Sequence, residues 1–193
     1  MTDEHLVPEL VARAQGGDVE AVGALYDHYA ERVFRFVRFR LSSPQDAEDV
    51  SQRVFLQMIQ ALPRYQGRGA PFGAWLFRIA RNAVIDSRRT HHAHEPLEAA
   101  ADTASGERGP EQIAITTSEM DRVGAAIAQL TDEQQEVIHL RFVAELSPRE
   151  IAAVLGRREG AIRGTQFRAL RALRLQLAQA ASSDSAIPKR ASD

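Results

Sequence analysis

The sequence predicts an all-α protein in which a flexible linker joins two small helical domains. Apolar residues recur every three or four positions through most of the chain, and no segment alternates as a half-buried strand does. Residues 93–117 break that periodicity with a stretch rich in Ala, Gly, Glu, Ser and Pro, as expected for a linker. A chain of 193 residues is long enough for one ordinary domain or two small ones.

The first domain is predicted over residues 6–92 and contains four helices. Each begins at a capping residue or at a proline, which fits the first helical position. The helices are expected at Pro8–Gln15, from Asp18 to about Leu41, from Ser43-Pro44 to Pro63, and from Pro71 to about Thr90. The positions expected to face the core are Val19, Val22, Leu25, Tyr29, Val33, Phe36, Val37, Val50, Val54, Met58, Ala61, Phe72, Trp75, Leu76, Ile79, Ala83 and Val84.

The second domain is predicted over residues 118–178, and residues 179–193 are expected to form a disordered tail. Three of its helices begin with a capping box, in which a Ser or Thr and a polar side chain three residues later satisfy the first backbone N–H groups. The helices are expected at 119–129, 132–143, 148–155 and 159–178. A tight turn joins the last two, and Gly156 can take the left-handed conformation there, which is typical of a helix-turn-helix.

The charged residues are segregated, so the formal net charge of −2 and the isoelectric point near 6.3 conceal local patches. Residues 63–92 hold six Arg and one Asp, and residues 157–174 hold six Arg and one Glu, a balance of +5 in each case. Residues 93–121 hold seven acids and one Arg, a balance of −6. Because local charge governs binding to phosphate, the two basic segments are candidates for a nucleic-acid interface.

Several classes of protein are not indicated. The chain has no cysteine, and His91, His92 and His94 lack neighbouring carboxylates, so we expect neither a metal nor another cofactor. No catalytic signature is present, so we do not expect an enzyme. The first residues lack the features of a signal peptide, and no apolar run approaches the roughly 18 residues that span a bilayer. A cytoplasmic protein without membrane insertion is therefore expected.

Two helices carry basic faces. The second helix of a helix-turn-helix lies in the DNA major groove, so the arginines of the last predicted helix are placed to contact DNA; a solvated basic helix is the alternative. The helix after Pro71 has an outward stripe of Arg78, Arg81, Asn82, Ile85, Arg88, Arg89 and His92. Like charges on one face repel unless phosphate neutralises them, and an Asn amide can bond a base edge. The preceding loop, 63–70, can hold a base that has left the duplex, whereas Phe72 and Trp75 are interpreted as core residues rather than as a strand-separating wedge.

The helix after Pro44 has an outward row of its own. The row consists of Asp49, Gln52, Arg53, Leu56 and Gln60. Their spacing places them on one side, opposite the apolar positions of the same helix. From this pattern alone, a solvated face is the simpler interpretation.

The two halves together resemble a bacterial RNA polymerase sigma factor of the extracytoplasmic-function (ECF, group IV) type, in the sigma-70 family. The run from Asp46 to Phe55 resembles the helix that binds core polymerase, and the run from Pro71 to Asn82 resembles the −10 element helix. Residues 130–142 and 146–169 resemble the −35-binding domain.

The resemblance implies a factor that binds core RNA polymerase and directs promoter-specific transcription initiation by recognising −10 and −35 elements. Its partners would be the β′ clamp coiled coil and β flap of the polymerase, promoter DNA and an anti-sigma factor. The implied polymerase contacts are Asp46, Asp49, Gln52, Arg53 and Leu56. The implied −10 contacts are Arg64, Arg68, Arg78, Arg81, Asn82, Arg88 and Arg89. The implied −35 contacts are Arg158, Arg163, Gly164, Phe167, Arg168 and Arg171.

The chain departs from the family pattern at three places. Arg53 stands where an acid is usual, Gly164 and Thr165 stand where Ser and Arg are common, and Arg157-Arg158 replaces a Ser or Thr cap. The alternatives are a regulator that binds DNA through the helix-turn-helix alone, with the first domain as a sensor or dimerisation module, and a nucleic-acid-processing enzyme.

Overall fold

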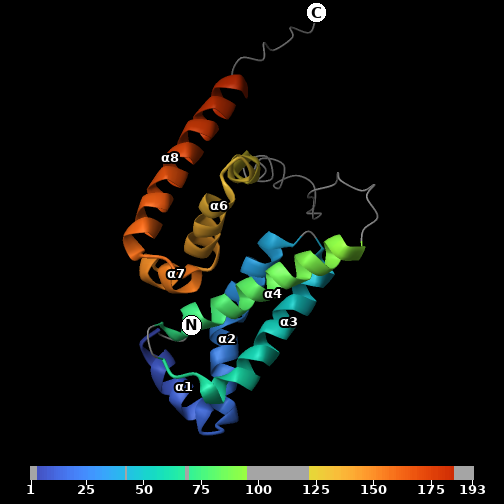
Figure 1. The fold of residues 1–193 in the computed structure, drawn as a ribbon, viewed down its shortest axis with the longest axis vertical. Coiled ribbons are helices and arrows are strands. Elements are labelled where there is room, and N and C mark those ends of the chain that lie inside the picture. The colour runs from blue at the N-terminus through green and yellow to red at the C-terminus, as the bar shows by residue number, and fades with distance from the viewer. Residues whose placement is uncertain (1–3, 42, 68–69, 95–121, 185–193) are drawn as a thin grey trace, which may run out of the picture. The chain divides into compact units, whose positions relative to one another are not determined.

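The computed structural model describes residues 4–41, 43–67, 70–94 and 122–184, and every regular element among them is helical (Figure 1). The elements are η1 Glu4–Leu6, α1 Val7–Gln15, α2 Val19–Arg40, α3 Pro44–Ala61, η2 Leu62–Arg64, α4 Phe72–His94, α6 Asp132–Ile138, the π-helical turn η3 His139–Val143, α7 Pro148–Leu155 and α8 Glu159–Asp184. Residues 122–128 are helical as well. The predicted all-α class is confirmed.

The chain divides into two compact units. The first unit contains the helices from α1 to α4 together with His139–Glu159. Among the described residues, the second unit contains those from 122 to Ile138 and those from Gly160 to Asp184. His139–Glu159 therefore packs with the first unit, although the sequence pattern groups it with the second predicted domain. The predicted linker from 95 onward and the predicted tail from 185 onward lie outside the described residues.

The core of the first unit lies where α2, α3 and α4 pack on one another. Its large, fully buried side chains include Leu25, Tyr29, Val33, Phe36, Val37, Met58, Leu76 and Phe77. Aromatic rings contact across helices: the Phe36 and Phe77 centroids lie 5.6 Å apart, edge to face. Most positions expected to face the core are buried, and Phe77, which was not among them, is buried too.

Val19 is a wrong prediction, because its side chain is 81% exposed. The buried side of α2 begins instead at Ala21 and continues through Leu25 and Tyr29. Successive helical residues are about 100° apart, so Val19 lies roughly 200° from Ala21 and faces away from the core. Val22, Ala61, Trp75 and Ile79 are half-buried, at the margin of the same core.

Two arginines of α2 bond the turn that follows η3. Arg32 donates through Nε and Nη2 to the Ala144 carbonyl, at 3.1 and 2.8 Å. Arg35 Nη2 forms an ion pair with Glu145 Oε1 at 2.7 Å, and Glu145 takes a left-handed backbone with φ of 60°. A carbonyl and a carboxylate at one turn thus meet two guanidinium groups from one helix.

The second unit has a small apolar core. Leu130, Ile138 and Ala169 form the buried cluster, and Leu170 and Leu173 of α8 pack against it. The predicted capping box at Thr131 is present, since Gln134 N donates to Thr131 Oγ1 and Thr131 N donates to Gln134 Oε1. The helix α8 continues to Asp184, so residues 179–184 of the predicted tail are helical instead.

The start of α2 depends on one carboxylate. Asp18 caps the helix by accepting from the N–H groups of Glu20 and Ala21, and Arg13 of α1 donates to its other oxygen at 2.8 Å. The hydrogen bond from Arg13, followed by the bond from the Ala21 N–H, holds the pKa of Asp18 below its ordinary value of 3.8. One side chain therefore joins α1 to the first turn of α2.

Acid should weaken the contact that Asp18 makes between α1 and α2. The pKa of Asp18 is lowered by folding, so its stabilising effect is complete above the ordinary carboxyl pKa and is lost as the pH falls through the folded value. Asp18→Asn keeps an oxygen that can cap the helix but removes the charge. We expect the thermal midpoint of the wild-type chain to exceed that of Asp18→Asn at pH 7 and the gap to close as the pH falls below the ordinary carboxyl pKa of 3.8. A constant gap across this range, measured by circular dichroism, would contradict the assignment.

Candidate nucleic-acid interface

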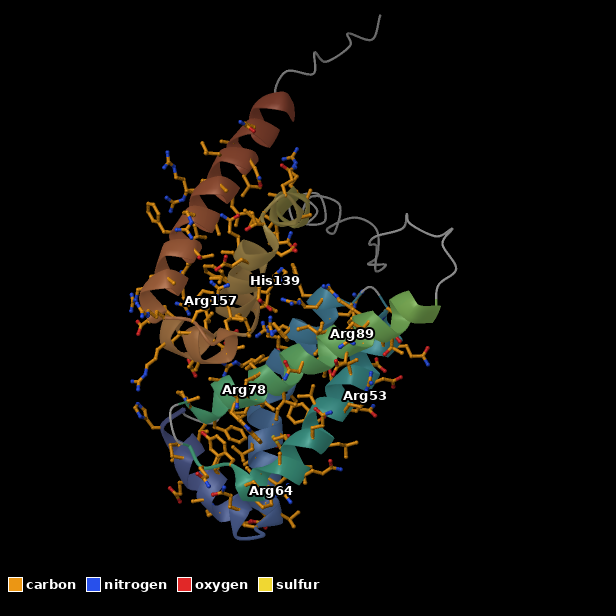
Figure 2. All side chains as sticks on the ribbon, viewed as in Figure 1. Arg53, Arg64, Arg78, Arg89, His139 and Arg157 are labelled. Carbon is orange, nitrogen blue, oxygen red and sulfur yellow. The ribbon has the colours of Figure 1, made fainter. Side chains whose placement is uncertain are left out.

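The face of α4 that was predicted to bind nucleic acid is largely exposed. Arg78, Asn82 and Arg89 are exposed, whereas Arg81 is half-buried. Buried residues such as Leu76, Ala80 and Val84 hold the opposite side of the helix against the core. Figure 2 shows Arg78 toward the start of α4 and Arg89 further along the same helix. With a rise of 1.5 Å per residue, eleven residues separate these two by about 16 Å along the axis.

Arg88 has a different environment from its neighbours. Its Nε and Nη2 donate to the carbonyl of Arg40, the last residue of α2. A cation at this position satisfies a carbonyl that the helix leaves free and offsets the negative end of the helix dipole. Arg88 thus joins α4 to the end of α2 as well as lying on the basic face.

The loop between α3 and α4 is held in shape by Tyr65. Its hydroxyl donates to the Ala70 carbonyl at 3.0 Å, across five residues. Its ring packs against Trp75 and Phe72, with centroids 4.9 and 5.5 Å away. Burial raises the pKa of the Tyr65 hydroxyl, so this group keeps the proton that it donates. Arg64 at the start of the loop is exposed, and Arg68 lies outside the described residues.

The aromatic residues at the start of α4 belong to the core. Phe72 is buried and Trp75 is half-buried, and both contact Tyr65. These contacts agree with the interpretation of Phe72 and Trp75 as packing residues. They also connect the loop to α4, because Tyr65 stacks on the first turn of that helix.

Gln15 is a residue of this region that sequence reasoning missed. It is the last residue of α1, and its Nε2 donates to the carbonyls of Leu62 and Tyr65, at 2.9 and 2.6 Å. These are the residues where α3 ends and the loop begins. A lone Gln at the end of a short helix carries no sequence signal for such a contact.

The predicted row on α3 forms a second exposed surface. Asp49, Gln52 and Arg53 are exposed, and Leu56 exposes 58% of its surface. Asp46 is half-buried in the first turn, where its N–H donates to the capping Ser43 hydroxyl. The structure adds Ile59, which is 47% exposed and lies one turn beyond Leu56. This face therefore combines polar groups with two exposed aliphatic side chains.

The helix α8 separates a buried side from a basic side. Ile162, Thr165 and Ala169 are buried. The exposed residues of the predicted interface are Arg158, directly before the helix, and Arg163, Phe167, Arg168 and Arg171 on it, while Gly164 is half-buried. Phe167 is 70% exposed, which is unusual for so large an apolar side chain. Arginine suits phosphates and the O6/N7 edge of guanine, and an apolar ring suits a thymine methyl, so this side can contact the major groove.

The residues leading into α8 have the helix cap and the turn conformation that the sequence predicted. The Ser147–Glu150 capping box at the start of α7 is complete. Gly156 ends α7 in the left-handed conformation with φ of 64°, which a residue with a side chain would adopt at a cost. Arg157 and Arg158 then precede Glu159, the first residue of α8.

Among the described residues, no group of three or more His, Cys, Asp or Glu side chains could hold a metal ion. The side chains of His91, His92 and His94 lie outside the described set. None of the described helices is long and apolar enough to cross a membrane.

Comparison with known proteins agrees with this arrangement. The family model for sigma-70 region 2 matches residues 25–94, and the model for sigma-70 region 4 matches residues 126–175. The ECF RNA polymerase sigma factor BldN of Streptomyces coelicolor is 36% identical over 174 residues, which are 89% of this chain and 66% of BldN. The ECF sigma factor SigD of Mycobacterium tuberculosis is 36% identical over 177 residues, which are 89% of this chain and 84% of SigD.

A solved structure is similar as well. CnrH, in complex with the cytosolic domain of CnrY, matches with a TM-score of 0.66 and 29% identity, covering 88% of this chain and 96% of CnrH. The two matched regions define a sigma factor of the sigma-70 family. The chain belongs to the ECF RNA polymerase sigma factors within it. Its activity is promoter-specific initiation of transcription with RNA polymerase.

The contact of Gln15 with the loop can be tested by hydrogen exchange. Gln15→Ala removes both donors, and the net worth of such bonds is about 1 kcal/mol. We expect the Tyr65 amide, which donates to the Leu62 carbonyl, to exchange about fivefold faster in Gln15→Ala than in the wild type. Gln57→Ala, at an exposed position of α3, is the matched control and should leave this amide unchanged. Equal rates in all three proteins would show that Gln15 does not hold the loop.

Proposed function

We propose that α3 binds core RNA polymerase, that α4 and its preceding loop recognise the −10 element, and that α8 recognises the −35 element. One observation carries this proposal: in a chain of this family, α4 and α8 each present exposed arginines opposite a buried apolar side. Such a helix has its rotation fixed by the core, so its charges point outward in a defined direction. Phosphate is the partner that best neutralises the positive charge of several guanidinium groups on one face.

The polymerase contact is assigned to Asp46, Asp49, Gln52, Arg53 and Leu56. These residues lie on one face of α3, and the exposed aliphatic surface of Leu56, extended by Ile59, supports a protein partner rather than a nucleic acid. The proposed partner is the β′ clamp coiled coil. Arg53 replaces the acid that is usual in the family, so the complementary surface should carry an acidic group near this position.

The −10 contact is assigned to α4 and the loop before it. Asn82 is exposed and offers both a donor and an acceptor to a base edge. Arg78 and Arg89, about three helical turns apart, suit phosphates, and Arg64 lies beside the loop that would hold a flipped base. Arg81 and Arg88 are assigned supporting contacts, since Arg81 is half-buried and Arg88 also bonds the end of α2. Arg68 is retained in the proposal from the sequence pattern.

The −35 contact is assigned to Arg158, Arg163, Gly164, Phe167, Arg168 and Arg171. Arg163, Phe167, Arg168 and Arg171 are exposed on the side of α8 opposite Ile162 and Ala169, which supports insertion of this helix into a major groove. Arg158 is exposed directly before the helix, and Gly164 is half-buried. The polymerase β flap is the proposed partner of the same domain. The acidic segment 93–117 is proposed to link the two promoter-binding domains.

Membership of the family supports proposals for a further partner and for the site of action. An anti-sigma factor is proposed as the partner of the free protein, in line with the solved complex of the similar CnrH with a domain of CnrY. Action at promoter DNA implies a cytoplasmic location beside the chromosome. The chain itself is proposed to carry no catalytic activity, since nucleotide addition belongs to the polymerase.

The proposal is tested by reconstitution. The purified chain, mixed with core RNA polymerase, should form a one-to-one complex on size exclusion and should start transcription at defined promoters selected from a genomic library. A regulator that acts through its helix-turn-helix alone would instead bind an operator without polymerase. Failure to bind core polymerase in the absence of other bacterial proteins would refute the proposal.

The two promoter elements should respond to different variants. Asn82→Ala should slow promoter opening about tenfold, with little change in binding to the −35 element, because one lost base contact costs about 1–3 kcal/mol. Arg168→Ala should weaken binding to the −35 element and leave the opening step of the bound complex nearly unchanged. Gln57→Ala serves as the control for both measurements. Permanganate footprinting reports opening, and equal losses in both steps for both variants would contradict the assignment.

A further inference from the structure

The side chain of Arg168 is turned back along α8. Its Nη2 donates to Thr165 Oγ1 at 3.0 Å. Its Nη1 lies 3.4 Å from the position that a Cβ atom on Gly164 would occupy. Long side chains on a helix lean toward its N-terminus, over the residues three and four positions earlier. The residues at 164 and 165 therefore decide where this guanidinium lies.

Thr165 offers Arg168 a fixed acceptor. Only 3% of Thr165 is exposed, and it lies on the same side of α8 as the buried Ile162 and Ala169. Its β-branched side chain has few rotamers in a helix. A hydroxyl in such a place needs a hydrogen-bond partner, and Arg168 is the donor that the structure provides.

Gly164 offers Arg168 room. Among the described residues, and leaving aside its chain neighbours and its own helix backbone, only Arg168 Nη1 lies within 4 Å of a Cβ atom built at this position. Any side chain longer than a methyl group would compete with the guanidinium for this space. Thr165 and Gly164 together thus form a seat for Arg168: one residue bonds the guanidinium and the other leaves the helix surface open beneath it.

We infer that Thr165 is a positioning residue for Arg168 and that the seat orients this arginine toward one guanine of the −35 element. The inference rests on the proposed function of α8. A guanidinium has five N–H donors, so the bond to Thr165 leaves enough of them to contact guanine O6 and N7 together. A guanidinium that is already oriented loses less conformational freedom when it binds. The two residues that depart from the family pattern are therefore specificity determinants acting through Arg168.

The test uses holoenzyme made from the full chain and core RNA polymerase, with a library of promoters randomised in the −35 element. Arg168→Ala should lower the preference for guanine at one position about tenfold. Thr165→Val, which keeps the shape of Thr165 but not its oxygen, should lower the preference at that same position about three- to fivefold. Thr165→Ser should retain it, because the acceptor remains. The double variant Thr165→Val/Arg168→Ala should match Arg168→Ala alone, as expected for residues that act as one unit.

The base profile separates positioning from a merely structural role. A Thr165→Val profile that is unchanged, or that is weakened equally at every promoter position, would overturn the inference. A wild-type holoenzyme without any base preference in the −35 element would overturn the proposed function of α8, and the inference with it. Gly164→Val, which fills the space beside Nη1, should change the preference at the Arg168 position and at no other.

A second measurement needs neither DNA nor a variant. Nitrogen relaxation of the arginine Nε–Hε groups in the free chain should show Arg168 as more restrained than Arg171 on the same helix. Equal mobility of the two side chains would refute the seat directly, even if Thr165→Val failed to fold.

Discussion

Burial of the apolar sides of α2, α3 and α4 against one another is the interaction on which the first unit depends. Each large apolar side chain that is fully buried contributes about 1.5–3 kcal/mol, and residues such as Phe36, Met58 and Phe77 come from all three helices. Because these contacts fix the rotation of every helix about its axis, they also fix the direction of the opposite, polar side. The exposed faces of α3 and α4 are therefore consequences of the core rather than independent features.

Arginine serves two distinct purposes in this chain. Arg13, Arg32 and Arg35 each bond a carboxylate or carbonyl of another element, and so hold the fold together. Arg78, Arg89 and most arginines of α8 instead lie exposed on faces whose reverse sides are buried. Composition counts them alike, and only the position of each relative to helix ends and neighbouring helices separates the structural group from the group proposed to bind DNA.

The sequence predicted what depends on local patterns and missed what depends on distant partners. Apolar periodicity and caps located the helices, and the capping boxes at Thr131 and Ser147 are present. The error at Val19 arises because this residue lies roughly 200° from Ala21, off the side of α2 that the core covers. The end of α8 was predicted six residues too early. Gln15 bonds residues 47 and 50 positions away, so no nearby residue could signal that contact. The assignments of individual side chains to polymerase and promoter remain proposals.

The division of α8 into a buried and an exposed side has a consequence for engineering and for evolution. The residues that anchor the helix, among them Ile162 and Ala169, are distinct from the arginines and Phe167 on its outer side. Outer residues can therefore be exchanged without removing the contacts that hold the helix in its domain. With the proposed recognition of the −35 element by α8, a duplicated gene can acquire a new set of target promoters by a few substitutions on this side. The same property makes α8 a suitable starting point for building transcription circuits that do not interfere with one another.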